Sequence, residues 1–374
     1  MPRPLAGAHA ANPGLAGVFS LAGPFAPRAA ARHTPPLRRQ LHPSGRMNAL
    51  TTRRQALALA VAAAATMAAA GPAAAQARKY PDHPITFIVP FPAGSATDQL
   101  ARVVAEHVGR AAGQSVIIDN KPGANGTIGT AAAAKAPADG HSFLIATSTT
   151  HAANASLYRK LPYDPIKDFA PVTRLGEIPF VMLVNPSVPA DTAQKFVAYA
   201  KANPDKLAWG SGSSGSLIPG HALVTANALR MTHVPYKGVQ PAMTDTMGGQ
   251  TQLVFADLSS GVPQVKAGKL RALAVTSAGE HPMLPGVPPL AVVVPGFEMT
   301  AWFAMYAPAA TPPAAVEKMN QWVRAALADP AVQAKVAPSG FKLTPSTPAE
   351  LGLFAAKETV KWAKAVQAAG IQAE

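Results

Sequence analysis

Four segments rich in Gly, Ser, Thr and Asn are the part of this sequence best suited to bind an anion. Each follows a predicted β-strand, and all but 147–151 lead into a predicted helix: 92–98, 121–127, 147–151 and 210–216. Backbone N–H groups at the start of a helix have no partner within the helix, and together with nearby hydroxyls they attract anions. Because these residue types also form turns and cap helices, any one segment could be purely structural. Four such loops together predict a pocket built from backbone amides and hydroxyls.

Motifs for catalysis are missing from the sequence. Segment 210–216 fits the G-x-G-x-x-G pattern, but residues 231–236, about 20 positions further on, lack the acidic residue that a dinucleotide site needs. The same segment misses the last glycine of G-x-S-x-G. The ten histidines form no HExxH motif, and there is no cysteine. We therefore expect no catalytic residue, no metal site and no cofactor. For His151, His221 and His233, near the predicted pocket, capping or core hydrogen bonds are the expected roles.

Short β-branched or aromatic runs alternate with helical patterns from residue 85 onward. This alternation predicts an α/β protein with mostly parallel sheets flanked by helices. The predicted strands are Ile85–Val89, Val116–Ile118, Phe143–Ala146, Val181–Val184, Leu207–Trp209, Gln252–Phe255, Leu270–Val275 and Phe303–Tyr306. The predicted helices are Thr97–Ala111, Thr127–Lys135, Thr192–Ala202, Leu217–Leu229, Gln240–Met247, Pro312–Ala328 and Ala349–Ala368.

The net charge of +14 does not indicate a nucleic-acid partner once the charges are located. Eight of the 33 basic residues lie in residues 1–77, which contain no acidic residue. The remaining 25 basic and 19 acidic residues leave a charge of +6 on residues 78–374, where the lysines are dispersed among apolar residues. A nucleic-acid-binding protein would instead concentrate its basic residues in a patch or stripe.

The first 77 residues predict export. Residues 47–77 combine the basic pair Arg53-Arg54, an apolar run and a small-residue pattern that ends at Ala77, as in a cleaved signal peptide. The arginine pair leaves both the general and the twin-arginine export routes open, and an uncleaved membrane anchor is the alternative. Residues 1–46 are rich in Pro, Ala and Arg and are expected to be a disordered or mis-annotated extension ahead of a true start at Met47. The predicted location is the periplasm.

From Tyr80 to its end, the chain resembles the substrate-binding receptors of tripartite tricarboxylate transporters, the Bug family of periplasmic solute-binding proteins. The resemblance lies in YPDHPITFIVPFPAGSATDQLAR, IIDNKPGANGTIGTAAAAKAPADGHSFLIATSTTHAANASLY, WGSGSSGS, HVPYKGVQPAMTDTMGGQTQLVFADLSSG and VKAGKLRALAVTS. It implies a two-lobed, type II periplasmic-binding-protein fold with two hinge crossovers, near Phe180 and Trp302. Lobe one would comprise residues 78–180 and 303–374, and lobe two residues 181–302.

The resemblance also implies a set of ligand-binding residues, with the ligand's carboxylate held by loops rather than by arginine. The expected residues are Phe91, Ser95, Ala96, Thr97, Asp98, Ala124, Asn125, Thr147, Ser148 and Thr149 in lobe one, and Ser213, Ser214, Gly215, Tyr236 and Asp257 in lobe two, with Lys237 nearby. Ser95 stands where the family commonly has glycine, so its hydroxyl would enter the pocket. Asp257 would accept a hydrogen bond from a ligand hydroxyl or ammonium group, or else cap a helix over 259–265.

The function implied by the resemblance is capture of a small carboxylate by closure of the two lobes. Candidate ligands are di- and tricarboxylates such as citrate, aromatic carboxylates and acidic amino acids. The expected partners are the membrane subunits of a transporter or, as the alternative, a sensor kinase that reads the closed form. We expect a monomer, no nucleic acid and no enzymatic activity.

Overall fold

The structure is a computed structural model that describes residues 57, 58, 60 and 80–374. The expectations for residues 1–46, and nearly all of those for the signal peptide at 47–77, fall outside this part. Among the residues described, no helix combines the length and the apolar character needed to cross a membrane.

Strands and helices alternate through residues 80–374, as the sequence predicts for an α/β protein. The strands are β1 Ile85–Val89, β2 Val116–Asn120, β3 Ser142–Thr147, β4 Phe169–Val184, β5 Ala208–Ser211, β6 Thr232–Pro235, β7 Leu253–Asp257, β8 Arg271–Val275, β9 Thr300–Pro308 and β10 Lys342–Leu343. The helices are α2 Ala96–Ala112, α3 Thr127–Ala134, α4 Asn154–Leu157, α5 Ala193–Ala202, α6 Ser214–Ala226, α7 Val239–Met247, α8 Leu258–Lys266, α9 Pro313–Ala328, α10 Pro330–Val336 and α11 Pro348–Ala368. Short helical turns include the π-turn η2, Thr149–Ala153.

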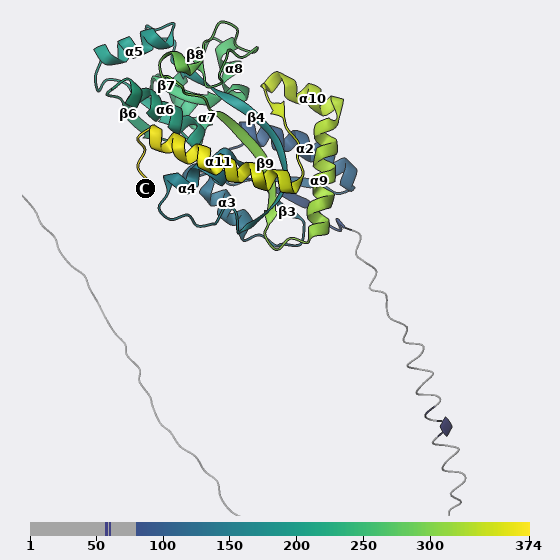
Figure 1. Ribbon diagram of the computed structural model, residues 1–374. Coiled ribbons are helices and arrows are strands. Elements are labelled where there is room, and N and C mark those ends of the chain that lie inside the picture. The colour runs from purple at the N-terminus through teal and green to yellow at the C-terminus, as the bar shows by residue number, and fades with distance from the viewer. Residues whose placement is uncertain (1–56, 59, 61–79) are drawn as a thin grey trace, which may run out of the picture. The chain divides into compact units, whose positions relative to one another are not determined.

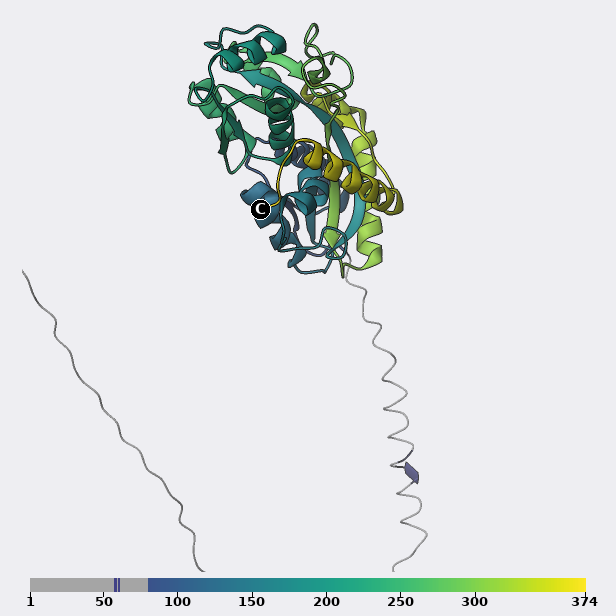
Figure 2. The ribbon, with the colours of Figure 1, turned by 60° about the vertical axis from the view of Figure 1, so that its left-hand side comes forward.

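One long strand, β4, joins the two halves of the sheet (Figures 1 and 2). The strand order is β2-β1-β3-β9-β4-β7-β5-β6, and β8 and β10 also pair with β4. From Phe169 to Pro179, β4 pairs with β9, whereas from Phe180 to Val184 it pairs with β7. A change of partner within one continuous strand produces two lobes on a shared backbone.

The sheet is mixed rather than mostly parallel. The pairs β1–β2, β1–β3, β5–β6 and β5–β7 are parallel. The pairs that β4 and β9 form with each other and with their neighbours are antiparallel. The reason is that β4 and β9 carry the chain between the lobes in opposite directions, while the outer strands of each lobe are joined by helical crossovers. The α/β prediction is confirmed, with this difference in the centre.

Strand β4 begins 12 residues earlier than the predicted strand Val181–Val184. Its first part contains Pro171, Gly176 and Pro179, which are poor strand residues in sequence-based reasoning. The pairing with β9 accommodates them, because its register shifts between Pro171 and Thr173 and again between Arg174 and Gly176. Strand β6 and helix α10 are also absent from the elements predicted from the sequence.

Helix α2 shows why these elements form where they do. Ser95 caps its start by accepting a hydrogen bond from the N–H of Asp98, and Gly113 ends it in the left-handed conformation with φ 66°. Leu100, Val104 and Val108 lie on the face that packs in the core and are almost fully buried. Each contributes about 1.5 to 3 kcal/mol through burial of apolar surface. The helix therefore holds the residues at its first turn in place.

Two connections between the lobes meet at Thr276, directly after β8. The N–H of Phe180 donates to Thr276 Oγ1 at 2.8 Å, and Thr276 Oγ1 donates to the carbonyl of Met299 at 2.6 Å. Backbone hydrogen bonds also link Thr276 N to Phe180 O and Met299 N to Thr276 O, both at 2.9 Å. Thr276 thus binds to β4 at its change of partner and to the segment that leads into β9.

Candidate ligand-binding site

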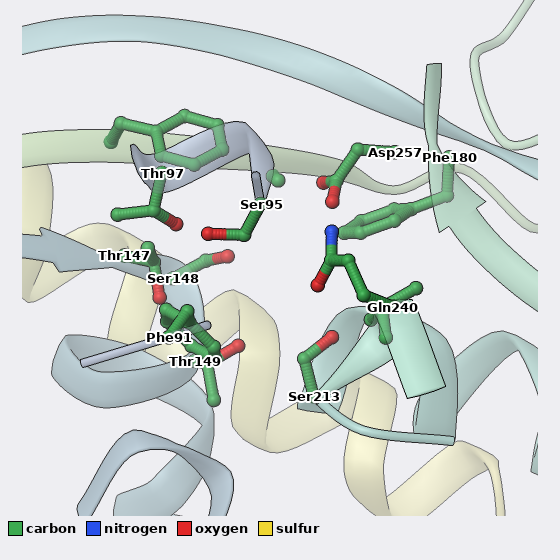
Figure 3. A pocket seen from close by; sticks show the side chains of 13 residues that line it. Phe91, Ser95, Thr97, Thr147, Ser148, Thr149, Phe180, Ser213, Gln240 and Asp257 are labelled. Carbon is green, nitrogen blue, oxygen red and sulfur yellow. The ribbon is translucent and has the colours of Figure 1, made fainter. Parts of the chain in front are cut away.

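A small pocket lies between the two halves of the sheet (Figure 3). Its walls come from the loops that follow β1 and β3 on one side and from lobe-two helix starts on the other. It is lined by Phe91, Ser95, Thr97, Thr147, Ser148, Thr149, Phe180, Ser213, Val239, Gln240, Asp257, Ala301 and Phe303.

The starts of four helices converge on this pocket. Ser95 and Thr97 belong to the start of α2, and Ser213 to that of α6. Val239 and Gln240 are the first residues of α7, and Asp257 directly precedes α8. The positive ends of four helix dipoles therefore point toward one small space, which favours a negatively charged occupant.

Two serines cap helices and line the pocket at the same time. Ser95 Oγ accepts from Asp98 N at 3.2 Å. Ser213 forms a capping box with Ser216 at the start of α6. The capping interpretation of these loops and the binding interpretation are therefore both supported for Ser95 and Ser213. Capping also explains why α6 begins at Ser214, three residues before the predicted start.

Hydroxyl groups dominate the lobe-one wall of the pocket. Thr147 ends β3, Ser148 directly precedes the π-turn η2, and Thr149 begins it. The Thr147 backbone is fixed because its N–H donates to Thr150 Oγ1 at 3.1 Å. Its own buried Oγ1 has no hydrogen-bond partner within residues 80–374. In Figure 3 the oxygens of Ser95, Thr97 and Ser148 point into the same space.

Acceptor groups occupy the lobe-two wall. Asp257 is partly buried and is the N-cap residue of α8, but its side chain makes no capping hydrogen bond. Burial raises the pKa of Asp257 to about 7. Gln240 Nε2 donates to Ser260 Oγ at 3.3 Å, while its buried Oε1 has no partner among the residues described. In Figure 3 the Asp257 carboxyl group and the Gln240 amide oxygen face the pocket from one side.

Of the fifteen expected site residues, eight line the pocket. They are Phe91, Ser95, Thr97, Thr147, Ser148, Thr149, Ser213 and Asp257. The other seven are Ala96, Asp98, Ala124, Asn125, Ser214, Gly215 and Tyr236, which support the walls or lie outside them. Lys237 does not line the pocket either.

Asp98 does not line the pocket, and its carboxylate holds the first loop in shape. Its carboxylate accepts from Gly94 N at 2.9 Å, Arg102 Nε at 2.9 Å and Asn120 Nδ2 at 3.0 Å. Burial acts to raise the pKa of Asp98, but the hydrogen bonds from Arg102, Gly94 and Asn120 outweigh it and lower that pKa below its usual value. Asp98 therefore positions the loop that carries Ser95.

Asn125 and Tyr236 also bind within the protein. Asn125 Nδ2 donates to Tyr158 Oη at 2.9 Å, and Tyr236 Oη donates to Asp245 Oδ2 at 2.7 Å. Burial, followed by the hydrogen bond to Asp245, raises the pKa of Tyr236 to about 12. Neither residue lines the pocket, and both have polar groups engaged by other side chains.

Ser214 and Gly215 act at the contact between the lobes. Ser214 Oγ donates to Thr149 Oγ1 at 2.8 Å, which joins α6 to the π-turn of lobe one. A Cβ atom at Gly215 would overlap the Phe180 ring, so only glycine permits this ring to pack against α6. Ala96 and Ala124 contribute no side chain to the pocket wall.

Sequence reasoning missed Phe180, Val239, Gln240, Ala301 and Phe303. Three of them lie on β4 and β9, and two begin α7, so no loop motif marks them. The predicted crossovers near Phe180 and Trp302 are the signal that could have identified Phe180 and Ala301. Strands that connect two lobes form the floor of the cleft between them.

Lysine, arginine and histidine are all absent from the pocket lining within residues 80–374. The family model described as tripartite tricarboxylate transporter family receptor matches residues 100–371. The chain belongs to this receptor family.

Solved structures of similar proteins agree with the assignment of this receptor. The periplasmic binding protein BugD is 33% identical with a TM-score of 0.76, and the match covers 79% of this receptor and all of BugD. A protein of R. palustris solved with adipate is 34% identical with a TM-score of 0.76, covering 79% and 100%. MatC from Rhodopseudomonas palustris, solved with malate, is 30% identical with a TM-score of 0.73, covering 77% and 100%. This receptor thus has the two-lobed fold of periplasmic binding proteins.

Proposed function

We propose that this receptor captures a small carboxylate in the periplasm and delivers it to the membrane subunits of a tripartite tricarboxylate-type transporter. The observation that carries the proposal is the pocket itself, where four helix starts and a wall of hydroxyls meet without a basic side chain. Such a site stabilises a carboxylate through N–H and O–H donors and needs no buried countercharge. Export to the periplasm is supported by the sequence of residues 47–77 and by the periplasmic relative BugD.

The two walls of the pocket differ in a way that defines the ligand. The lobe-one wall offers the hydroxyl donors of Ser95, Thr97 and Ser148, whereas the lobe-two wall offers the acceptors Asp257 and Gln240 Oε1. A ligand with a carboxylate at one end and a hydroxyl or ammonium group at the other satisfies both walls. Hydroxy acids and amino acids are therefore the proposed class. The malate found in MatC is a hydroxy acid that also carries a second carboxylate.

Direct contact between the lobes supports capture by closure. Ser214 in α6 binds Thr149 across the pocket, and Gly238 lies so close to Pro92 that a Cβ atom there would stand 2.5 Å from the proline ring. Closure of this kind shields the ligand from water, which strengthens its hydrogen bonds. The closed surface is then the form that a membrane partner recognises.

Calorimetric titration tests the pocket assignment. Malate, aspartate, adipate and citrate are titrated into the wild type and into Ser148→Ala, with Ser115→Ala, an exposed serine at the far edge of lobe one, as the matched control. Loss of one hydrogen bond to a charged group costs about 1.5 to 3 kcal/mol, so Ser148→Ala is expected to weaken the best ligand by roughly 10- to 100-fold. Unchanged affinity in Ser148→Ala, or no binding by any carboxylate, would contradict the assignment.

The pH dependence of binding tests the ligand class. Asp257 is the one titratable side chain among the described lining residues, and its pKa is raised to about 7 by burial. Neutral Asp257 can donate to a second carboxylate, whereas ionised Asp257 repels it. Adipate is therefore expected to bind more weakly at pH 8 than at pH 5.5, and a hydroxy acid with a single carboxylate, such as lactate, to be less affected. Asp257→Asn should remove the difference, while the exposed Asp191→Asn should retain it. Equal adipate affinity at both pH values would contradict the role of Asp257.

Transport itself is tested in cells. Deletion of the gene is expected to abolish growth on the ligand found by calorimetry, and the wild-type gene should restore it while the Ser148→Ala gene restores it poorly. Delivery to a sensor kinase would use the same closed form, but deletion would then change gene expression and leave uptake of labelled ligand intact.

A further inference from the structure

A second group of polar side chains lies at the opposite ends of β1 and β3 from the ligand pocket. Asp82 and His83 come just before β1, and His141 directly precedes β3. Parallel pairing of these strands, with Thr86 beside Ser142, brings the three residues together. One ligand atom from each, a carboxylate oxygen and two imidazole nitrogens, lies within 4.8 Å of the others.

His141 is the buried member of this cluster. Its exposed fraction is 7%, yet neither ring nitrogen forms a hydrogen bond within residues 80–374. Asp82 Oδ1 lies 3.4 Å from its Nε2, and Asp139 Oδ1 lies 3.5 Å from its Nδ1. Leaving buried polar atoms unpaired is costly, so an imidazole in this state is suited to a ligand that the side chains do not supply.

The other two members can move toward a shared ligand. His83 is exposed, its ring stacks on that of His141 with centroids 3.6 Å apart, and its Nδ1 lies 2.7 Å from Asp82 Oδ1. Asp82 Oδ1 therefore stands between the two imidazoles. Because the side chains of Asp82 and His83 are partly in solvent, small rotations can bring both donors to one point while His141 stays fixed.

The surroundings keep His141 in position. Tyr80 packs edge-on against its ring with centroids 5.2 Å apart, and Tyr80 Oη donates to the carbonyl of Gly140 at 2.6 Å. Trp322 of α9 stacks on Tyr80 from the other side. Tyr80 and His141 line a surface cavity that is open to solvent and is also lined by Asp82, His83, Asp139 and Lys318. An ion can therefore reach the cluster from outside.

We propose that Asp82, His83 and His141 bind one divalent transition-metal ion, with Asp139 orienting His141. Two imidazoles and a carboxylate are the donors that Zn²⁺, Ni²⁺ and Cu²⁺ accept, whereas Mg²⁺ and Ca²⁺ prefer oxygen alone. A histidine that binds metal through one nitrogen commonly donates its other N–H to a carboxylate, and Asp139 lies beside Nδ1 for that purpose. Three protein ligands leave a position open to water or to a group from a partner.

Metal binding here joins the segment before β1 to the start of β3. A ligand that binds only the folded state raises stability in proportion to the logarithm of its concentration over its dissociation constant. Zn²⁺ is therefore expected to raise the melting temperature of the protein.

Titration of the full-length, tag-free protein with Zn²⁺ against a chromogenic chelator tests the proposal. We expect one tight site in the wild type, at least 100-fold weaker binding in His83→Gln and in Asp82→Asn, and roughly 10- to 100-fold weaker binding in Asp139→Asn. His281→Gln, a half-buried histidine elsewhere, is the matched control and should bind Zn²⁺ like the wild type.

The exposed His83 keeps the test informative even if changes at His141 disturb folding. The same His83→Gln protein should bind its carboxylate with wild-type affinity, so failure of the metal site and failure of the ligand pocket are distinguishable. Zn²⁺ affinity that is unchanged in His83→Gln and Asp82→Asn, or the absence of a site with one ion per chain, would overturn the proposal. X-ray absorption of the Zn²⁺ complex should show two imidazole ligands in the wild type and one in His83→Gln.

Discussion

The two ends of strands β1 and β3 carry opposite chemistry. Their carboxyl ends lead to Ser95, Thr147 and Ser148, which are neutral and offer donors to the pocket. Their amino ends are preceded by His83 and His141, with Asp82 and Asp139 beside them. The direction of the chain explains why donors gather at the carboxyl ends. Helices begin after these ends, and their first N–H groups have no partner within the helix.

The carboxyl ends of β1 and β3 illustrate how a protein can bind an anion without a positively charged side chain. At the carboxyl ends the helix starts supply positive potential, so the pocket avoids the desolvation cost of a buried arginine or lysine. At the amino ends the start of α9 lines the cavity together with Asp82, His83 and His141, and here the side chains themselves offer charge and lone pairs to a ligand. The two edges should therefore respond to different ligands and to different mutations.

The largest expected effect is at the carboxyl edge, in Asp98→Ala. It removes the side-chain acceptor of the Gly94 N–H and one of the two acceptors of Asn120 Nδ2, so we expect the free energy of unfolding to fall by about 2 to 4 kcal/mol at pH 7. Because the folded state lowers the pKa of Asp98, its stabilisation is present above the unfolded-state pKa and is lost as the pH falls through the folded-state pKa. Urea denaturation at pH 7 and pH 3 measures both effects. Unchanged Zn²⁺ affinity in the folded variant would support independent binding at the two edges. A loss of Zn²⁺ affinity as large as the loss of stability would contradict it.

Asp257→Asn is expected to have the next largest effect, and in the opposite direction. The folded-state pKa of about 7 lies above the unfolded value, so the wild type is destabilised as the pH rises between about 4 and 7. The variant lacks this penalty and should be more stable than the wild type by about 1 to 3 kcal/mol at pH 8, with little difference at pH 4. Thermal unfolding at the two pH values checks this. A variant that is less stable at pH 8 would show that the carboxylate has a partner there.

Ser214→Ala removes the hydrogen bond to Thr149 between the lobes. Because the pair is buried, we expect a loss of about 0.5 to 1.5 kcal/mol in the closed form, seen as roughly 3- to 10-fold weaker carboxylate binding. Calorimetry measures this, with Ser115→Ala as the control. Zn²⁺ binding should not change, because the hydrogen bond lies at the other edge. Wild-type carboxylate affinity would show that this contact does not favour closure.

The smallest expected effect is at the amino edge, in Tyr80→Phe. It removes the hydrogen bond to Gly140, the residue before His141, and should lower stability by about 1 kcal/mol. Zn²⁺ affinity is expected to fall a few-fold, while carboxylate affinity stays at the wild-type value. Chelator competition and calorimetry on the same sample compare the two. A change in carboxylate affinity larger than the change in Zn²⁺ affinity would show that the edges are coupled.

Much of the fold could be predicted because its elements are locally encoded. Ile85–Val89 is a β-branched run whose bounds agree with β1, and the predicted helix Thr97–Ala111 differs from α2 by one residue at each end. The first part of β4 could not be predicted, because Pro171, Gly176 and Pro179 argue against a strand. The first part of β4 is extended because it pairs with β9 from Phe169 to Pro179, which is a long-range contact that the local sequence does not reveal.

Pocket residues that lie in loops could be predicted from the sequence, whereas pocket residues that reach the site only through tertiary packing could not. The loop serines and threonines follow strands, so their place at the carboxyl edge could be inferred from order along the chain. Phe180, Gln240 and Phe303 become pocket residues only when β4, α7 and β9 meet. The cluster of His83 and His141 was missed for a related reason, since spacing rules search within one helix or loop while these residues meet through strand pairing.

The bonds of Thr276 have a mechanical consequence. This residue binds both Phe180 and Met299, so hydrogen bonds through one side chain and its backbone tie the two connections between the lobes to each other. The Phe180 ring also forms part of the pocket wall. A molecule that contacts this ring therefore touches the strand that joins the lobes, at the residue bound to Thr276.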